Sequence, residues 1–221
     1  MDKKWTKAKL AAVIDHSVLR AVADEATLKK ACQEAREFGF ASICVNPCWV
    51  PLCAAELAGS GTIVCAVVGF PMGTSATSIK AEEARLAVSE GAGEIDVVIN
   101  IGKAKSEDWN YIAQDIAAVV KAAKPAKVKT IIETCVLDRQ EKILACRAAA
   151  AAGADYVQTS TGFGTGGALV EDIVLMRQTL GGVAQVKAAG GIRTRAECIA
   201  MLEAGAERIG TSSSLDIMTE H

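Results

Sequence analysis

Short apolar runs rich in Val and Ile alternate along the chain with longer segments that mix apolar and charged positions. The apolar runs have the length and composition of β-strands and cover residues 11–17, 41–46, 62–70, 94–102, 128–134, 155–161, 184–191 and 207–213. The segments between them carry Ala, Glu, Lys and Arg with helical periodicity, as in 24–38, 77–91, 106–124 and 138–153. The pattern therefore predicts eight strand–helix units along the chain.

Local signals support the predicted helix ends. Ser106 precedes two acidic residues, which predicts a capped helix start where carboxylates meet the positive end of the helix. A glycine follows each of four helical runs, at Gly39, Gly91, Gly153 and Gly205. The phrases EGAGEIDVV, AAGADYVQT and EAGAERIGT repeat the order helix, glycine, strand.

Strands separated by helices are expected to pair in parallel, because parallel neighbours need a crossover connection. Eight such units in 221 residues fit a closed (β/α)8 TIM barrel, a single domain over residues 1–221. An open, doubly wound sheet is the alternative, but no G-x-G-x-x-G sequence follows the first strand. Polar residues near the ends of nearly all the strands favour the barrel, which brings those ends together around one axis.

Composition excludes several classes of protein. Apolar residues make up 51% of the chain, and a net charge of -2 gives no basic excess for binding nucleic acid. No apolar run approaches the ~20 residues that span a bilayer, and the N-terminal region has no signal-peptide pattern. We therefore expect a cytoplasmic protein with no nucleic-acid or membrane partner.

The chain contains eight cysteines but only two histidines. None of the cysteines forms a C-x-x-C pair, and most lie in predicted strands or helices. A disulfide framework is not expected in a chain with this much core, and a zinc site would need closer pairs with histidines. We expect reduced, buried thiols, no metal and no other cofactor.

Six polar residues interrupt predicted strands that should be almost entirely apolar. They are Asp15, Asp96, Lys129, Glu133, Gln158 and Lys187. A structural network of ion pairs is one explanation, because buried charges need partners. A catalytic site is favoured, since these positions lead into the end of the barrel where barrel enzymes carry out chemistry. Period-two alternation also predicts that Lys129 and Glu133 share one face of their strand.

Lysines and carboxylates in an apolar cage suggest carbonyl chemistry. A desolvated lysine near another cation has a lowered pKa and can supply the free amine that attacks a carbonyl. The loops TSTGFGTGG (159–167), GGIRT (190–194) and GTSSS (210–214) follow the last three strands. Their backbone N–H groups and hydroxyls suit a phosphate, although tight turns also need glycine. We expect a small substrate that carries a carbonyl group and a phosphate.

These phrases together resemble the 2-deoxyribose-5-phosphate aldolase family in its shorter, bacterial-type form. The matching stretches are IDHS (14–17), FGFASICVNP (38–47), VVGFPMG (67–73), EIDVVINIG (94–102), KTIIET (129–134), DYVQTSTGF (155–163), VKAAGGIRT (186–194) and RIGTSS (208–213). The resemblance implies a (β/α)8 barrel and a metal-free aldolase that reversibly cleaves 2-deoxyribose 5-phosphate to glyceraldehyde 3-phosphate and acetaldehyde. The implied intermediate is a lysine Schiff base, and a homodimer would suit the family.

The resemblance also implies roles for individual residues of this chain. Asp96 matches an aspartate that relays protons through water, and Lys187 matches a second lysine that tunes the pKa of the nucleophile. Asp15 matches a carboxylate that supports the lysines. The residues expected to contact substrate, of which the late glycines and serines form a phosphate cradle, are Cys44, Lys129, Thr161, Gly162, Gly190, Gly191, Ser212 and Ser213.

Gln158 occupies the position, immediately before TSTG, where the family has its Schiff-base lysine. A primary amide cannot form the iminium because its nitrogen lone pair is delocalised, so covalent catalysis is lost. Four explanations stay open: an introduced substitution, a variant with a new non-covalent activity, a natural relative that only binds a sugar phosphate, or another amine, Lys187 or Lys129, that acts instead. We expect impaired aldolase activity.

Overall fold

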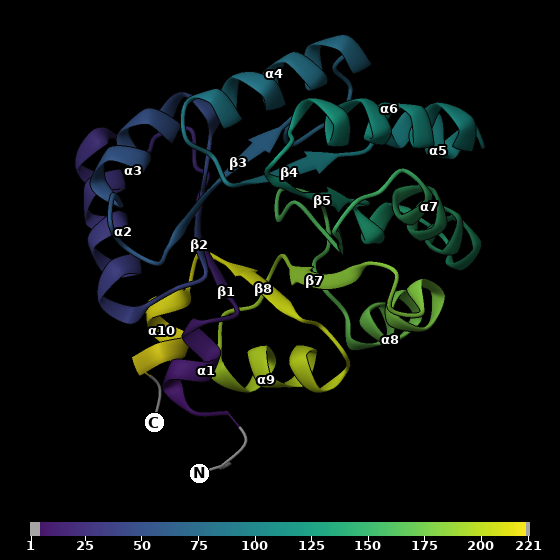
Figure 1. Ribbon diagram of the computed structural model, residues 1–221. Helices are drawn as coiled ribbons and strands as arrows, with labels where there is room; N and C mark the ends of the chain where they lie inside the picture. Colours follow the sequence, from purple (N-terminus) through teal and green to yellow (C-terminus); the bar gives the residue numbers. More distant parts are fainter. Residues whose placement is uncertain (1–4, 220–221) are drawn as a thin grey trace.

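The computed structural model describes residues 5–219, which form a closed barrel of parallel strands inside a ring of helices (Figure 1). The strands are β1 (Ile14–Val18), β2 (Ser42–Val45), β3 (Ile63–Val68), β4 (Glu94–Val98), β5 (Lys127–Ile131), β6 (Tyr156–Gln158), β7 (Gln185–Ala189) and β8 (Arg208–Thr211). Each strand pairs with its neighbours in chain order, and β8 closes on β1. The predicted (β/α)8 barrel is confirmed, and the doubly wound alternative is wrong.

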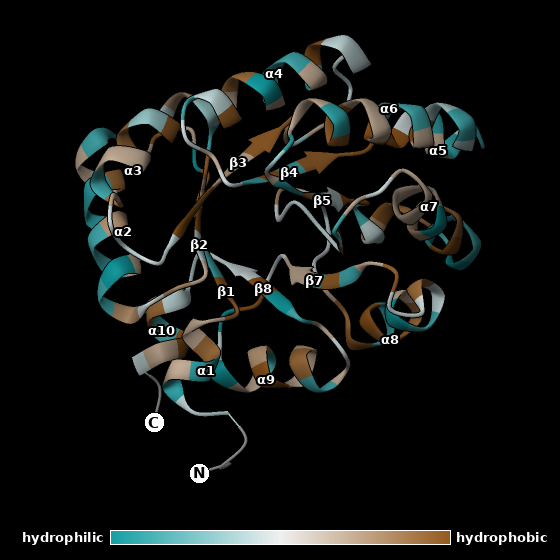
Figure 2. Ribbon diagram, in the orientation of Figure 1, coloured by the Kyte–Doolittle hydropathy of each residue, from teal (hydrophilic) through white to brown (hydrophobic). Residues whose placement is uncertain are grey.

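Helices connect the strands around the outside of the barrel. They are α1 (Lys7–Ala11), α2 (Glu25–Phe38), α3 (Val50–Glu56), α4 (Thr77–Ser89), α5 (Ile101–Lys105), α6 (Trp109–Ala122), α7 (Arg139–Ala151), α8 (Val170–Leu180), α9 (Arg195–Glu203) and α10 (Ser214–Thr219), with 3-10 turns η1 (Pro47–Trp49) and η2 (Thr134–Val136). The outer sides of the helices are largely hydrophilic, whereas β3 is largely hydrophobic (Figure 2). This distribution buries one stripe of each helix against the barrel.

The main core lies between the strands and the helices. On β4, Ile95 and Val97 belong to this core and are at most 1% exposed. Because successive strand residues point to opposite faces, Glu94 and Asp96 then point into the barrel. The alternation that fills the outer core thus also places charged side chains on the barrel axis.

The residues that cap the helices were predicted from the sequence only in part. Gly39 ends α2 in the left-handed conformation, with φ 70°, as its place after a helical run predicts. The start predicted at Ser106 is wrong: Ser106 follows α5, and Asp108 caps α6 by accepting a hydrogen bond from the Tyr111 N–H at 3.2 Å. Glu107, with φ 59°, turns the chain between the two helices.

The cysteines are free thiols, and six of them are buried as predicted. Cys48 and Cys135 are exposed, which corrects the prediction for these two. Both lie in 3-10 turns after strands, in η1 and η2, where the chain passes over the rim of the barrel. Among residues 5–219, no helix is long and apolar enough to cross a membrane.

Candidate active site

A cavity of about 860 Å³ opens at the carboxyl ends of the strands. Most of the residues predicted for the site line it: Cys44, Asp96, Gln158, Thr161, Gly162, Lys187, Gly190, Gly191 and Ser212. Asp15 and Lys129 are fully buried and lie deeper in the barrel than this lining. The cavity therefore combines the predicted polar strand residues with the predicted glycine-rich loops.

Two lysines and three carboxylates form an ionic network beneath the cavity. Lys187 Nζ lies 2.6 Å from Asp15 Oδ2 and 2.6 Å from Asp96 Oδ2. Lys129 Nζ lies 2.8 Å from Asp96 Oδ1 and 2.6 Å from Glu94 Oε2. Asp96 is therefore bracketed by two ammonium groups, one on each oxygen.

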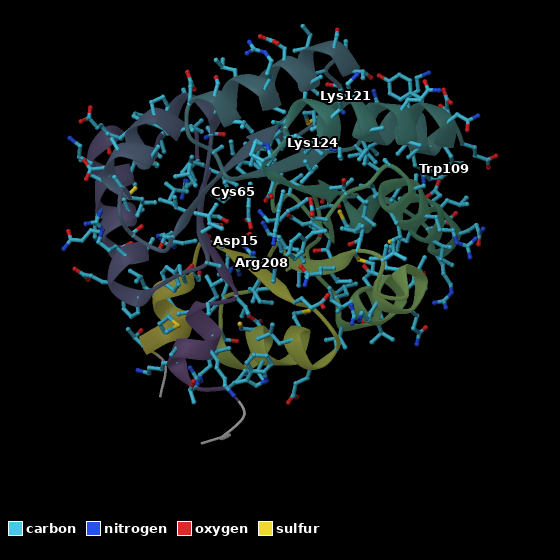
Figure 3. The ribbon with its side chains drawn as sticks, in the orientation of Figure 1. Asp15, Cys65, Trp109, Lys121, Lys124 and Arg208 are labelled. Atoms are coloured by element: carbon cyan, nitrogen blue, oxygen red, sulfur yellow. The ribbon has the colours of Figure 1, made fainter. Side chains whose placement is uncertain are left out.

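Arg208 of β8 completes the network. Its Nη1 lies 2.6 Å from Asp15 Oδ1 and 3.0 Å from Glu94 Oε2. Figure 3 shows Asp15 and Arg208 within the ring of helices, with Trp109 at the periphery. Sequence reasoning missed Glu94 and Arg208. Glu94 could have been found, because it lies two residues before Asp96 and therefore on the same face of β4.

The network lowers the pKa values of Asp15 and Asp96. Burial alone would raise the pKa of Asp15, but Lys129, Lys187 and Arg208 outweigh burial and hold that pKa below its ordinary 3.8. The pKa of Asp96 is also lowered, because Lys129 and Lys187 outweigh its burial. Asp15 and Asp96 are therefore ionised at neutral pH.

The same pairing keeps both lysines protonated. Burial by itself lowers the pKa of Lys187, but Asp15 and Asp96 raise it above the ordinary 10.5. The pKa of Lys129 is raised well above 10.5, where again two aspartates outweigh burial. An ammonium group has no lone pair with which to attack a carbonyl. The geometry therefore argues against Lys187 or Lys129 as a replacement nucleophile.

Gln158 ends β6 beside Lys187, its Cα partner on β7. The side chain is only 4% exposed and lines the cavity. Its Nε2 donates a hydrogen bond to the Ser160 carbonyl oxygen at 2.9 Å. The amide thus occupies the predicted nucleophile position in a definite orientation.

Glu133 does not share a face with Lys129, contrary to the sequence prediction. Strand β5 ends at Ile131, and Glu133 takes a left-handed conformation with φ 54°. Its Oε2 accepts a hydrogen bond from the Thr161 N–H at 3.0 Å. Period-two alternation failed because the chain leaves the strand before Glu133, which instead holds the loop after β6.

Glycines allow the close approaches that shape the cavity. A Cβ on Gly210 would lie 3.0 Å from Lys187 Cε and 2.9 Å from Ala189 Cβ. Gly190 has φ 94°, and a Cβ there would lie 3.0 Å from Ser160 Cβ. These positions need glycine so that the loops after β6 and β7 can pack against each other and Lys187 can reach across the barrel.

A cluster of possible metal ligands lies in the same region. Sγ of Cys44, Sγ of Cys65 and a carboxylate oxygen of Asp96 lie within 4.8 Å of one another. However, Lys129 Nζ lies 3.2 Å from Cys65 Sγ, and Lys187 Nζ is bonded to Asp96. Burial chiefly raises the pKa of Cys65 well above 9.0 and keeps it a thiol. The positive charge of two adjacent ammonium groups and the protonated thiol disfavour a divalent cation here, because zinc is bound by thiolates. The cluster is instead suited to hydrogen bonding.

A second polar group was missed by sequence reasoning. His16, on β1, lies 3.0 Å from Ser214 Oγ through Nδ1 and 3.3 Å from Glu34 Oε2 through Nε2. Burial is the main cause that lowers the pKa of His16 below 6.5. The neutral imidazole links α2 to the start of α10, directly after the serine-rich loop. His16 lies in the stretch IDHS (14–17) that resembles the family, but its partners Ser214 and Glu34 are known only from the fold.

Comparison with known proteins agrees with this architecture. The model of the family described as DeoC/LacD family aldolase matches residues 9–219. The chain belongs to this family. Deoxyribose-phosphate aldolase from Carboxydothermus hydrogenoformans is 53% identical over 217 residues, covering 96% of this chain and 95% of that protein. The enzyme of the same name from Brevibacillus brevis is 53% identical over 206 residues, covering 93% of each.

Solved structures of family members share the barrel. A putative deoxyribose-phosphate aldolase from Coccidioides immitis is 40% identical, with a TM-score of 0.95, over 97% of this chain and 86% of that one. Deoxyribose phosphate aldolase from Aeropyrum pernix, described as tetrameric, is 30% identical, with a TM-score of 0.90, over 96% and 91%. An aldolase named QR15 is 36% identical, with a TM-score of 0.92, over 96% and 95%.

Proposed function

We propose that this protein is a deoxyribose-phosphate aldolase scaffold that binds 2-deoxyribose 5-phosphate but has impaired Schiff-base catalysis. The observation that carries the proposal is Gln158, a buried amide in the cavity beside Lys187. The relatives at 53% identity carry the name deoxyribose-phosphate aldolase, which supports the substrate. The family resemblance places a reactive lysine where this amide stands.

The phosphate is proposed to bind at the loops after β6, β7 and β8. Gly162, Gly190, Gly191 and Ser212 line that end of the cavity. Backbone N–H groups and hydroxyls in such loops can form an anion-binding concavity. Ser213 is adjacent, and its N–H bonds to Thr211 Oγ1 at 2.9 Å. This hydrogen bond supports a role for Ser213 in shaping the cradle.

The carbonyl end is proposed to reach Gln158, Lys187 and Asp96. In the family reaction, cleavage into acetaldehyde and glyceraldehyde 3-phosphate breaks the bond between C2 and C3, and the lysine iminium receives the electron pair. Gln158 cannot form that iminium, and Lys187 is held as an ammonium group by two carboxylates. Asp96 and Lys187 keep the arrangement proposed for proton transfer, but the electron sink is missing.

Restoring the amine tests this function. The Gln158→Lys variant is expected to cleave 2-deoxyribose 5-phosphate and to form a borohydride-stable adduct with acetaldehyde on residue 158. Gln158→Met, which is similar in length but has no amine, is the matched control and should form no adduct. A folded Gln158→Lys protein that binds substrate and stays inactive would contradict the proposal.

A sugar-phosphate binder without catalytic activity is the alternative function. It is favoured by the hydrogen bond from Gln158 Nε2 to the Ser160 carbonyl oxygen at 2.9 Å, which holds the amide in place where an amine would be needed for catalysis. Binding of 2-deoxyribose 5-phosphate to the unaltered protein, with no cleavage and no trapped adduct on any lysine, would support this alternative. The homodimer expected from the resemblance stays a prediction.

A further inference from the structure

Gln158 carries a buried, unsatisfied acceptor in the wall of the cavity. Its Nε2 donates to the Ser160 carbonyl oxygen at 2.9 Å, whereas its Oε1 is buried and has no hydrogen-bond partner within residues 5–219. The reverse orientation of the amide would place two acceptors, Oε1 and the Ser160 carbonyl oxygen, against each other. The side chain is therefore held with its oxygen buried and unpaired.

Lys187 offers a donor close to that acceptor. Gln158 and Lys187 are Cα partners on adjacent strands, and both side chains line the cavity. An ammonium group has three N–H donors. One of them is donated to Asp96 Oδ2 at 2.6 Å, and Nζ also forms an ion pair with Asp15 Oδ2 at 2.6 Å. Within residues 5–219, Asp96 and Asp15 are the partners of Lys187 Nζ, and we assign its remaining donor capacity to a molecule bound in the cavity.

We infer that this pair recognises a hydroxyl group at C1 of a sugar phosphate, in the ring-closed hemiacetal or the open-chain alcohol, rather than a free aldehyde. A hydroxyl can donate to Gln158 Oε1 and accept from Lys187 Nζ at the same time. A carbonyl oxygen only accepts, so the buried Oε1 would remain unsatisfied, which is costly. A lysine at position 158 would instead need the open aldehyde for attack.

The inference rests on the proposed function for the phosphate end and deepens it at the carbonyl end. The cavity of about 860 Å³ can hold a pentose phosphate that spans both ends. Ile131 and Ala189 also line it near the ends of their strands. A buried acceptor beside such apolar lining discriminates strongly between ligands with and without a matching donor.

Calorimetric titration with three sugar phosphates that differ at C1 tests the inference. The probes are 2-deoxyribose 5-phosphate, 2-deoxyribitol 5-phosphate, which has a C1 alcohol, and 1,4-anhydro-2-deoxyribitol 5-phosphate, which has no C1 hydroxyl. The unaltered protein is expected to bind the first two at least about 10-fold more tightly than the third. In Gln158→Met, which lacks the amide oxygen, the difference should fall to about 2-fold or less.

The outcomes separate this inference from the function on which it rests. Equal affinity for all three probes, or an unchanged difference in Gln158→Met, would overturn hydroxyl recognition and leave the sugar-phosphate site standing. Failure of every probe to bind the unaltered protein would overturn both. Circular dichroism of Gln158→Met shows whether the variant is folded. If it is not, Gln158→Leu replaces it in the same comparison.

Discussion

At the scale of single residues, the neutral amide at position 158 leaves the charges of the barrel interior balanced. Three carboxylates in the network face three cations, and Gln158 adds no charge. A lysine at this position would be a fourth cation, buried beside the Lys187 ammonium group. Burial and a like charge both disfavour the protonated form of an amine. The network is therefore suited to activate a lysine that this chain does not have.

The amine restored in Gln158→Lys is accordingly expected to have a pKa well below the ordinary value of about 10.4. The pH dependence of adduct formation with acetaldehyde and borohydride measures it. In the double variant Gln158→Lys/Lys187→Met, the like charge is gone and the apparent pKa should rise by about one unit or more. Identical pH profiles for the two variants would show that Lys187 does not tune the amine.

Asp96 is expected to be essential for stability, since it neutralises two buried lysines. Asp96→Asn keeps the shape but leaves Lys129 and Lys187 with one carboxylate fewer. Breaking a buried pair in this way typically costs about 3–5 kcal/mol, measurable by urea unfolding at pH 7. Glu82→Gln is the control, because the Glu82–Arg85 pair is exposed and screened by solvent, so it should contribute little to stability. A similar small loss in both variants would contradict the role assigned to Asp96.

At the scale of elements, the alternation of apolar and amphipathic segments was sufficient to predict the barrel. The residues that begin and end the helices and strands were harder to predict, because several polar residues near each turn could take the capping position. Ser106 looked like a helix start, yet Asp108 caps α6. Glu133 looked like a strand residue, yet its left-handed backbone takes it out of β5. Both errors concern the residues that connect elements.

The candidate site shows the same division. Asp96, Lys187 and Gln158 could be predicted because a polar residue in a buried parallel strand is conspicuous. Their partners could not be paired from the sequence, because Arg208 and Glu94 lie 114 positions apart. Only the closed register of the strands brings them together. The identity of a site residue was thus accessible, whereas its interaction partners required the fold.

Glu133 is expected to control the phosphate loop, because it joins the loops that follow β5 and β6. In Glu133→Ala the Thr161 N–H loses its carboxylate acceptor. We expect about 10-fold weaker binding of 2-deoxyribose 5-phosphate, as for the loss of one charge-assisted hydrogen bond. Calorimetry measures the affinity, and hydrogen exchange at residues 159–165 measures the order of the loop. Glu171→Ala, an exposed change on α8, should alter neither; unchanged exchange in Glu133→Ala would contradict this role.

At the scale of the whole molecule, the ionic network ties together strands from both halves of the chain. It joins Asp15 of β1 to Lys129 of β5, Lys187 of β7 and Arg208 of β8. Because Asp15 has a lowered pKa and Lys187 a raised one, these two groups bind different numbers of protons in the native and unfolded chains only outside a central pH range. Within that range the contribution of the network to stability should be constant.

Stability is lost as the pH falls below the lower limit of this range and as the pH rises above the upper limit. Asp15, with a pKa below 3.8 in the folded protein, contributes stability that is fully present above pH 3.8 and is lost as the pH falls below it. Lys187, with a pKa above 10.5, contributes stability that is fully present below pH 10.5 and is lost as the pH rises above it. His16 has a lowered pKa and adds a separate loss of stability below pH 6.5, so total stability alone cannot isolate the network.

Differences between variants remove the contribution of His16. The unfolding free energy of the unaltered protein minus that of Asp15→Asn is expected to be constant between about pH 5 and 9 and to shrink below pH 3.8. The same difference for Lys187→Met should be constant over that interval and shrink only above pH 10.5. Urea unfolding across the pH range measures both. A Lys187→Met difference that already shrinks between pH 7 and 9 would mean that Lys187 loses its proton near neutrality, and it would reopen Lys187 as an amine nucleophile.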